Sequence, residues 1–164
     1  MMPLLQCCVP KMWVSRVALS LVLWVAGPAA LVAQQANPIL GRWLTQPGDG
    51  IIEITRTADN TYQGTIIGGN APRRLDEHNP KPGRRQQLLL GQVILKNMHE
   101  DSDGALAGGT IYEPDTGRTY KCHIETLDHD RLKVRGFIGV SLLGRSQVWT
   151  RFTGTSLDLS TSAH

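Results

Sequence analysis

The chain has 164 residues, of which 17 are basic, 14 are acidic and 41% are hydrophobic. This length allows one domain with a single hydrophobic core. The formal net charge of +3 is too small to indicate a polyanion-binding surface, so nucleic acid is not expected as a partner.

The first 33 residues have the order of a secretory signal peptide. Lys11 and Arg16 precede ten uncharged, mostly apolar residues at 17–26, and small residues follow up to Ala33. A bilayer-spanning helix needs about 20 apolar residues, and this run is shorter. We therefore predict that residues 1–33 are a signal peptide cleaved after Ala33, which leaves a secreted mature chain without a membrane span. Cleavage after Ala30 or Ala36 and an uncleaved membrane anchor are the alternatives.

The rest of the chain is nearly neutral and has one thiol. Residues 34–164 hold 15 basic and 14 acidic residues, and Cys122 is their only cysteine, so no internal disulfide is expected. Residues 39–153 are the predicted folded domain. Residues 154–164 are polar and rich in Ser and Thr, which predicts a flexible tail.

Short apolar stretches separated by turn residues run through the domain. Apolar and polar residues alternate most clearly at 131–135, where Leu132 and Val134 share one face and three cations share the other. Such one-sided alternation is typical of antiparallel sheets, and short connections make sequence neighbours pair. The predicted strands are residues 40–46, 50–57, 61–68, 88–97, 105–112, 118–127, 131–138 and 145–153. They predict an all-β fold, an eight-stranded antiparallel up-and-down β-barrel, with a two-sheet sandwich as the alternative.

A tryptophan and an arginine at opposite ends of the domain indicate how the barrel closes. Trp43 lies in the first predicted strand and Arg151 in the last. A stacked indole and guanidinium contribute about 0.5–2 kcal/mol. We predict that this pair closes one end, so that a binding site lies at the other end or inside. Strict alternation then places Gln147, Trp149 and Arg151 on the inward face and Val148 on the outward face, unless a bulge intervenes.

A long connection at residues 69–87 has no apolar period. Connections of this length are typically functional or disordered. Its cations would bind an anionic headgroup at the barrel mouth, and a solvated charged loop is the alternative. Asp76 and Asn79 are expected to hold the loop through hydrogen bonds to backbone N–H groups. Residues 139–144 fit either a strand continuation or a helical turn. The loop candidates are Arg73, Arg74, Asp76, Asn79, Arg84 and Arg85.

Several segments carry a resemblance to a known family. They include Gly41-Arg42-Trp43-Leu44-Thr45, Leu75-Asp76-Glu77-His78-Asn79-Pro80, Gly109-Thr110-Ile111-Tyr112-Glu113-Pro114-Asp115-Thr116-Gly117-Arg118-Thr119-Tyr120 and Gly144-Arg145-Ser146-Gln147-Val148-Trp149-Thr150-Arg151. In this order and spacing, residues 39–153 resemble the bacterial secreted family called domain of unknown function 2147. The resemblance implies a lipocalin-like, calycin-type barrel in the bacterial periplasm. Family members often carry a Trp where Ala105-Leu106-Ala107 stands here, so a ligand contact by that Trp is not expected.

No motif in the sequence indicates catalysis. The five histidines have no metal-ligand spacing, and no G-x-S-x-G, Cys–His or phosphate-loop pattern occurs. We therefore predict a protein that is not an enzyme, with no catalytic residue, no metal and no cofactor.

The predicted function is non-catalytic binding of a small hydrophobic or amphipathic ligand inside the barrel. Burial of apolar surface would hold the ligand, and polar groups at the mouth would orient it. Cys122 is expected inward as a small hydrophobe, with a reactive thiol as the alternative, while Tyr112 and Tyr120 either contact the ligand or pack in the sheet. The alternative function is that of a packed barrel without a ligand, which binds a protein partner in the cell envelope. The candidate pocket residues are Ile52, Ile54, Tyr62, Ile66, Tyr120, Cys122, Ile124, Leu132 and Val134.

Overall fold

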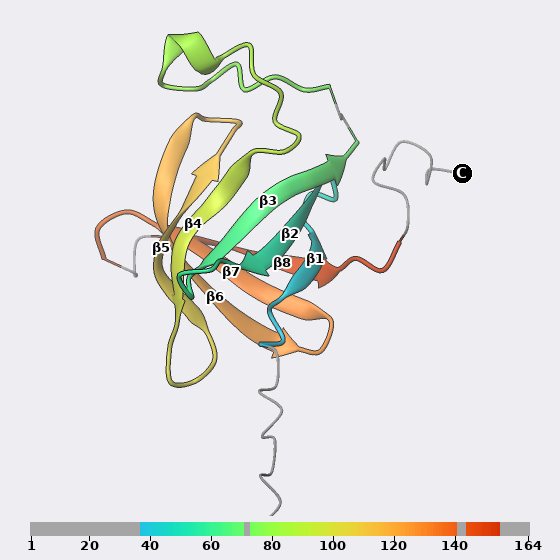
Figure 1. The fold of residues 1–164 in the computed structure, drawn as a ribbon, viewed down its shortest axis with the longest axis vertical. Coiled ribbons are helices and arrows are strands. Elements are labelled where there is room, and N and C mark those ends of the chain that lie inside the picture. Colours follow the sequence, from blue (N-terminus) through green and yellow to red (C-terminus); the bar gives the residue numbers. More distant parts are fainter. Residues whose placement is uncertain (1–36, 71–72, 141–143, 155–164) are drawn as a thin grey trace, which may run out of the picture. The chain divides into compact units, whose positions relative to one another are not determined.

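The alternating segments of the sequence pair with one another in chain order. The computed structural model describes residues 37–70, 73–140 and 144–154. Each strand pairs antiparallel with the next, and the last pairs with the first, which closes a barrel (Figure 1). The strands are β1 (Gly41–Leu44), β2 (Gly50–Arg56), β3 (Tyr62–Gly69), β4 (Val93–Glu100), β5 (Leu106–Glu113), β6 (Arg118–Asp128), β7 (Arg131–Phe137) and β8 (Gly144–Arg151).

This topology confirms the predicted all-β, eight-stranded antiparallel barrel, and the two-sheet sandwich is wrong. The predicted signal peptide at 1–33 and all of the predicted tail except Gly154 lie outside the described residues. Within the described part of the chain, no helix has the length and apolar character needed to cross a membrane.

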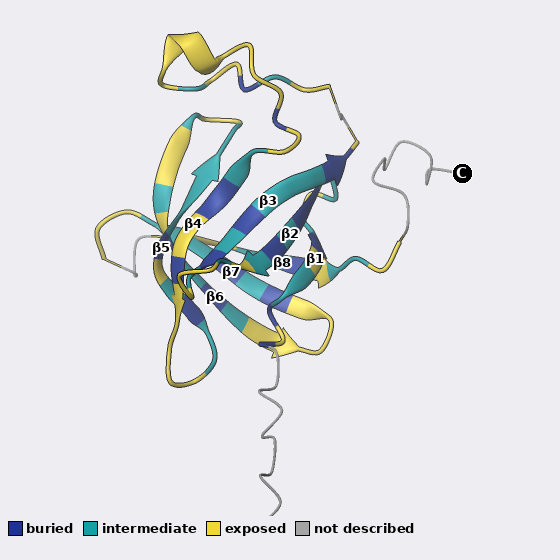
Figure 2. Cartoon of the chain, viewed as in Figure 1, coloured by how far each residue is buried: buried dark blue, intermediate teal, exposed yellow. Residues whose placement is uncertain are grey.

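Strand alternation decides which side chains fill the barrel. Leu132 and Val134 on β7 are buried, and Leu132 pairs with the buried Trp149 on β8. The β7–β8 register runs without a shift, so Arg151 faces the same side as Trp149 and no bulge intervenes. Figure 2 shows the result as buried bands that alternate with more exposed positions along the strands.

The seam between β1 and β8 is short, and an aromatic–cation stack reinforces it. Only two register positions join these strands, Trp43 with Arg151 and Leu44 with Thr150. The guanidinium carbon of Arg151 lies 4.1 Å from the centroid of the Trp43 ring. Trp43 is fully buried, and its indole N–H donates a 2.8 Å hydrogen bond to the carbonyl of Ile39. The predicted pair therefore forms and closes this end of the barrel.

The N–H groups of the Arg151 guanidinium tie β8 to the segment before β1 and to the β6–β7 turn. Its Nη2 donates to the Pro38 carbonyl at 2.8 Å, its Nη1 to the Leu40 carbonyl at 3.3 Å and its Nε to the His129 carbonyl at 3.0 Å. Gly41 leaves room for this arrangement. Its φ is +119°, and a Cβ atom there would lie 3.2 Å from Nη1 of Arg151. A side chain at position 41 would thus be strained and would crowd the guanidinium.

The half of the barrel next to this pair is tightly packed. The hydrophobic core of the barrel includes seven of the predicted pocket residues, and all seven are buried: Ile52, Ile54, Tyr62, Cys122, Ile124, Leu132 and Val134. Cys122 is 1% exposed, which confirms its predicted inward position. Burial raises the pKa of its thiol to about 12, so the thiol stays protonated at neutral pH and is a poor nucleophile. The core also contains residues that were not predicted to line a pocket, among them Leu95, Met98 and Leu106.

The predicted strand at 88–97 is wrong at its start, because β4 begins only at Val93. The apolar run before it belongs to the connection from β3. Leu89 donates its backbone N–H to the carbonyl of Arg74, and Gly91 turns the chain with a φ of +84°. The connection also contains a short 3-10 helix, η1 (Pro82–Arg84). Of residues 139–144, Gly144 begins β8, and 141–143 lie outside the described residues.

Replacement of Arg151 by Ala tests the role of the seam. The variant loses the stack on Trp43 and three hydrogen bonds to carbonyls, so we expect its free energy of unfolding to fall by about 2–4 kcal/mol. Urea denaturation followed by tryptophan fluorescence measures the change. Arg84→Ala, at an exposed position in η1, is the control and should shift the midpoint little. Equal losses in the two variants would contradict a special role for Arg151.

Candidate functional site

A cavity of about 720 Å³ opens at the barrel end opposite the Trp43–Arg151 pair. The connections β1–β2, β3–β4, β5–β6 and β7–β8 meet at this end, and residues from each of them line the cavity. Trp43 and Arg151 do not line it. The barrel is therefore not filled by its own side chains, and the volume lies within the range of small-molecule sites.

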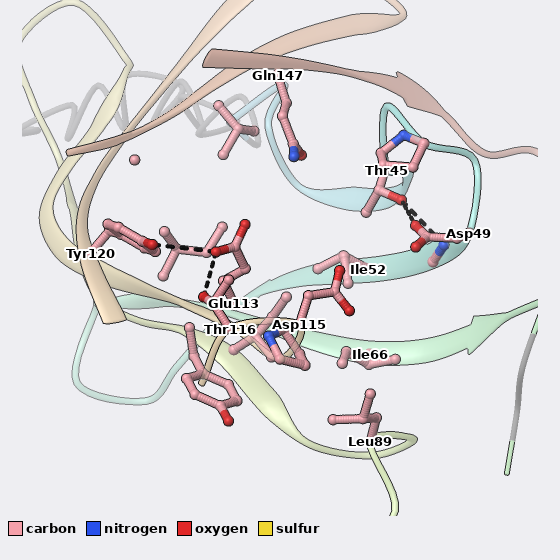
Figure 3. A pocket seen from close by; sticks show the side chains of 18 of the residues that line it. Thr45, Asp49, Ile52, Ile66, Leu89, Glu113, Asp115, Thr116, Tyr120 and Gln147 are labelled. Carbon is pink, nitrogen blue, oxygen red and sulfur yellow. Dashed lines mark hydrogen bonds between the residues drawn. The ribbon is translucent and has the colours of Figure 1, made fainter. Parts of the chain in front are cut away.

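The deeper wall of the cavity is apolar. Figure 3 shows Ile52, Ile66 and Leu89 directed toward the open space. Gly136 leaves part of this space free, because alternation turns it inward and it has no side chain. A Cβ atom at this position would lie 3.5 Å from Cβ of Tyr120, at ordinary contact distance. The apolar lining residues are Ile52, Ile66, Leu89, Ile94, Ile111, Val134, Phe137 and Trp149.

A carboxylate faces the cavity between two hydroxyl groups. Glu113, the last residue of β5, accepts a hydrogen bond from the Thr116 hydroxyl at 2.6 Å and one from the Tyr120 hydroxyl at 3.3 Å (Figure 3). The turn between β5 and β6 brings these three residues together. Both hydroxyl groups thereby point their protons at Glu113, and the position of its carboxylate is fixed.

An amide group projects into the cavity from β8. Gln147 extends inward, as Figure 3 shows, and its Oε1 accepts a 3.0 Å hydrogen bond from the indole N–H of Trp149. This bond sets the orientation of the amide. Its Nε2 is therefore the end that offers donors to the cavity.

Three arginines stand around the rim. Arg74 forms an ion pair with Asp115, which ties the β3–β4 connection to the β5–β6 turn. Arg118 and Arg145 also line the cavity, at the beginnings of β6 and β8. Strand alternation puts Arg118 on the face of Tyr120 and Arg145 on the face of Gln147.

The structure separates the nine predicted pocket residues into two groups. Ile52, Ile66, Tyr120 and Val134 line the cavity. The other five do not line it and belong to the packed half of the barrel: Ile54, Tyr62, Cys122, Ile124 and Leu132. All nine face inward as alternation predicts, but only four of them border the cavity.

Asp76 differs from the prediction for the long connection. It is completely buried, and its carboxylate accepts hydrogen bonds from the Tyr112 hydroxyl and from the side-chain amide of Asn79, each at 2.6 Å. Its partners are thus side chains instead of the backbone N–H groups expected. Asn79 does accept a backbone N–H, that of Lys81, at 2.9 Å. Asp76 thereby anchors the connection to β5.

The predicted cations of the connection do not act together at the mouth. Arg74 alone among them lines the cavity. Arg85 instead donates to the backbone carbonyl of Asn79 at 2.9 Å, and Arg73 and Arg84 are exposed. The connection packs closely on the β5–β6 turn, because a Cβ atom on Gly117 would lie 1.9 Å from the carbonyl oxygen of His78.

Several residues that shape the cavity were not predicted as pocket residues. Gln147 and Gly136 could have been found by extending the alternation of Trp149 and Val134 by one step toward the mouth. Glu113 could have been found from its position at the end of a strand. Leu89 had no such signal, because the connection that places it beside the cavity is irregular.

A closed eight-stranded antiparallel barrel with a cavity at one end defines a lipocalin-like protein. The chain belongs to the family described as "Uncharacterized protein conserved in bacteria (DUF2147)", whose model matches residues 41–151. In structure it is similar to protein HP1028 from Helicobacter pylori, which is described as belonging to the lipocalin family. The two share 19% identity with a TM-score of 0.62, over 70% of this chain and 82% of that chain. No curated protein matches this chain.

Replacement of Tyr112 by Phe tests the anchor at Asp76. Burial, together with the nearby carboxylate of Asp76, raises the pKa of the Tyr112 phenol to about 12. Its contribution to stability is therefore complete below the unfolded pKa near 10 and is lost as the pH rises through 12. We expect Tyr112→Phe to be less stable than the parent at pH 7, and to lose less stability between pH 10 and 12. Urea midpoints measured across this range check the expectation, and parallel curves would contradict it.

Proposed function

We propose that the protein binds a small hydrophobic or amphipathic ligand in its open-ended cavity, without catalysis. The observation that carries this proposal is the unfilled volume of about 720 Å³, with an apolar deeper wall and oriented polar groups nearer the mouth. A ligand that buries about 300 Å² of apolar surface gains about 7 kcal/mol before the costs of immobilisation.

The alternative, a barrel that acts through a protein partner without a ligand, depends on a filled interior. The open cavity favours ligand binding over this alternative. Among the described residues, no three His, Cys, Asp or Glu side chains are arranged to hold a metal ion. Binding by apolar burial accounts for the apolar residues that face the cavity.

A glycine at the cavity wall offers a direct test. Gly136→Leu adds a side chain at the cavity wall. The φ of Gly136 is not positive, so the backbone accepts a side chain, and the added Cβ makes only ordinary contacts. We expect at least about tenfold weaker binding of a neutral fluorescent dye, N-phenylnaphthylamine, with the barrel intact by circular dichroism.

The matched control is Gly83→Leu, since a Cβ atom at Gly83 meets nothing within 4 Å and this position does not line the cavity. It should bind the dye like the parent. Native mass spectrometry of gently purified protein adds a second measurement, in which copurified lipid is expected in the parent and reduced in Gly136→Leu. Equal dye affinities in the two variants, with no bound lipid in the parent, would contradict the proposal.

We also propose that the protein acts after secretion, in the bacterial periplasm, once residues 1–33 have been removed. The support is the order of basic, apolar and small residues at the start of the sequence. Intact-mass measurement of the protein recovered from a periplasmic extract should show Gln34 as the first residue. A mass that includes residues 1–33 would contradict cleavage.

A further inference from the structure

Some polar groups that line the cavity have hydrogen-bond or ion-pair partners within the protein, and others do not. Every carboxylate in the lining already has a donor from a neighbouring side chain. Asp49 accepts from the Thr45 hydroxyl at 2.8 Å, Glu113 from Thr116 and Tyr120, and Asp115 from Arg74. A ligand therefore finds the acidic groups of the cavity already occupied by the protein.

Three other donor groups in the lining differ from these paired groups. The guanidinium groups of Arg118 and Arg145 and the Nε2 of Gln147 have no hydrogen-bond or ion-pair acceptor among the described residues. Arg118 and Arg145 are exposed and Gln147 is half-buried, so water can hydrogen-bond to these groups when no ligand is bound. A ligand that enters and displaces this water must supply acceptors in its place.

The sheet register brings these donors to one side of the mouth. Arg145 pairs across β8 and β7 with Gly136, and Gln147 pairs with Val134 one step deeper. The Cβ position of Gly136 lies 3.5 Å from Tyr120, whose strand β6 also carries Arg118 two residues nearer the mouth. At the register position of Arg145, the wall between β6 and β8 therefore carries no side chain from β7, and a Cβ atom on Gly136 would make only ordinary contacts with Tyr120 and Ile111.

We propose that the ligand is an amphiphile with an anionic head, a carboxylate or a phosphate, and an apolar tail. Arg118 and Arg145 hold the head over Gly136, and Nε2 of Gln147 donates to an oxygen of the head. Arginine suits this role, because its planar guanidinium donates two parallel hydrogen bonds to such groups. The tail lies against Ile52 and Ile66. This inference rests on the proposed function and adds the chemistry of the head.

Four probes with the same twelve-carbon tail test the head chemistry. They are dodecanoate, dodecyl phosphate, dodecanol and dodecyltrimethylammonium, and each is titrated at pH 8 and low salt against N-phenylnaphthylamine bound to the full mature chain. We expect at least one anionic probe to displace the dye at about tenfold lower concentration than dodecanol, and the cationic probe to be no better than dodecanol. The anionic probe that displaces the dye at the lower concentration identifies the head as a carboxylate or a phosphate.

Two variants assign the preference to the named donors. Arg118→Gln/Arg145→Gln should lose the preference for anions and keep its affinity for dodecanol. Gln147→Glu keeps an acceptor for the Trp149 indole and replaces the free donor by an oxygen, so it should also lose the preference. The matched control is Lys96→Gln/Lys121→Gln, which removes the same charge from exposed positions that do not line the cavity, and it should keep the preference.

The outcomes separate this inference from the proposed function. Equal displacement by dodecanol and both anions, or a preference that survives in Arg118→Gln/Arg145→Gln, overturns the anionic head while ligand binding stands. Displacement by inorganic phosphate or acetate alone overturns the amphiphile. Failure of the dye and all four probes to bind the parent overturns both proposals.

Discussion

The stack of Arg151 on Trp43 is the contact on which the rest of the barrel depends. A ring of antiparallel strands closes only if its first and last strands meet, and β1 meets β8 at just two register positions. So short a ladder supplies few hydrogen bonds, and the two side chains add what it lacks. The indole fills one end of the barrel, and the guanidinium binds carbonyl groups of the incoming chain and of the β6–β7 turn.

Closure at one end has consequences for the other. Large side chains such as Trp43, Tyr62 and Leu132 pack into the half nearest the stack. Toward the mouth the inward positions become smaller or polar, as Gly136 and Gln147 illustrate, and the interior is no longer filled. The β3–β4 connection then completes the wall, because the buried hydrogen bond between Asp76 and Tyr112 holds it in place and Leu89 extends from it into the cavity lining. The tightly packed core and the open cavity therefore lie toward opposite ends of the barrel.

Two of the polar groups at the mouth are held in fixed positions before any ligand arrives. Trp149 orients the Gln147 amide, and two hydroxyl groups hold Glu113. Preorganisation of these two groups lowers the entropic cost of binding, since their side chains are already ordered. The chain shares its fold with lipocalin-like proteins and its family with bacterial proteins. The pairing of the cavity's carboxylates, and the availability of two of its arginines, are features of this chain's own residues.

The sequence by itself determined the strands, their antiparallel order and which side chains face inward, because alternation and turn residues act locally. It also identified Trp43 and Arg151, and it placed Cys122 in the core. It could not separate Val134, which borders the cavity, from Leu132, which lies below it, because alternation specifies a face and not a depth along the barrel axis. The late start of β4 and the burial of Asp76 were likewise decided only in the tertiary structure. The carboxylate of Asp76 is held by Tyr112 on the distant strand β5, and the segment before β4 is held by hydrogen bonds to Arg74 and to Ile66 on β3, which no local pattern encodes.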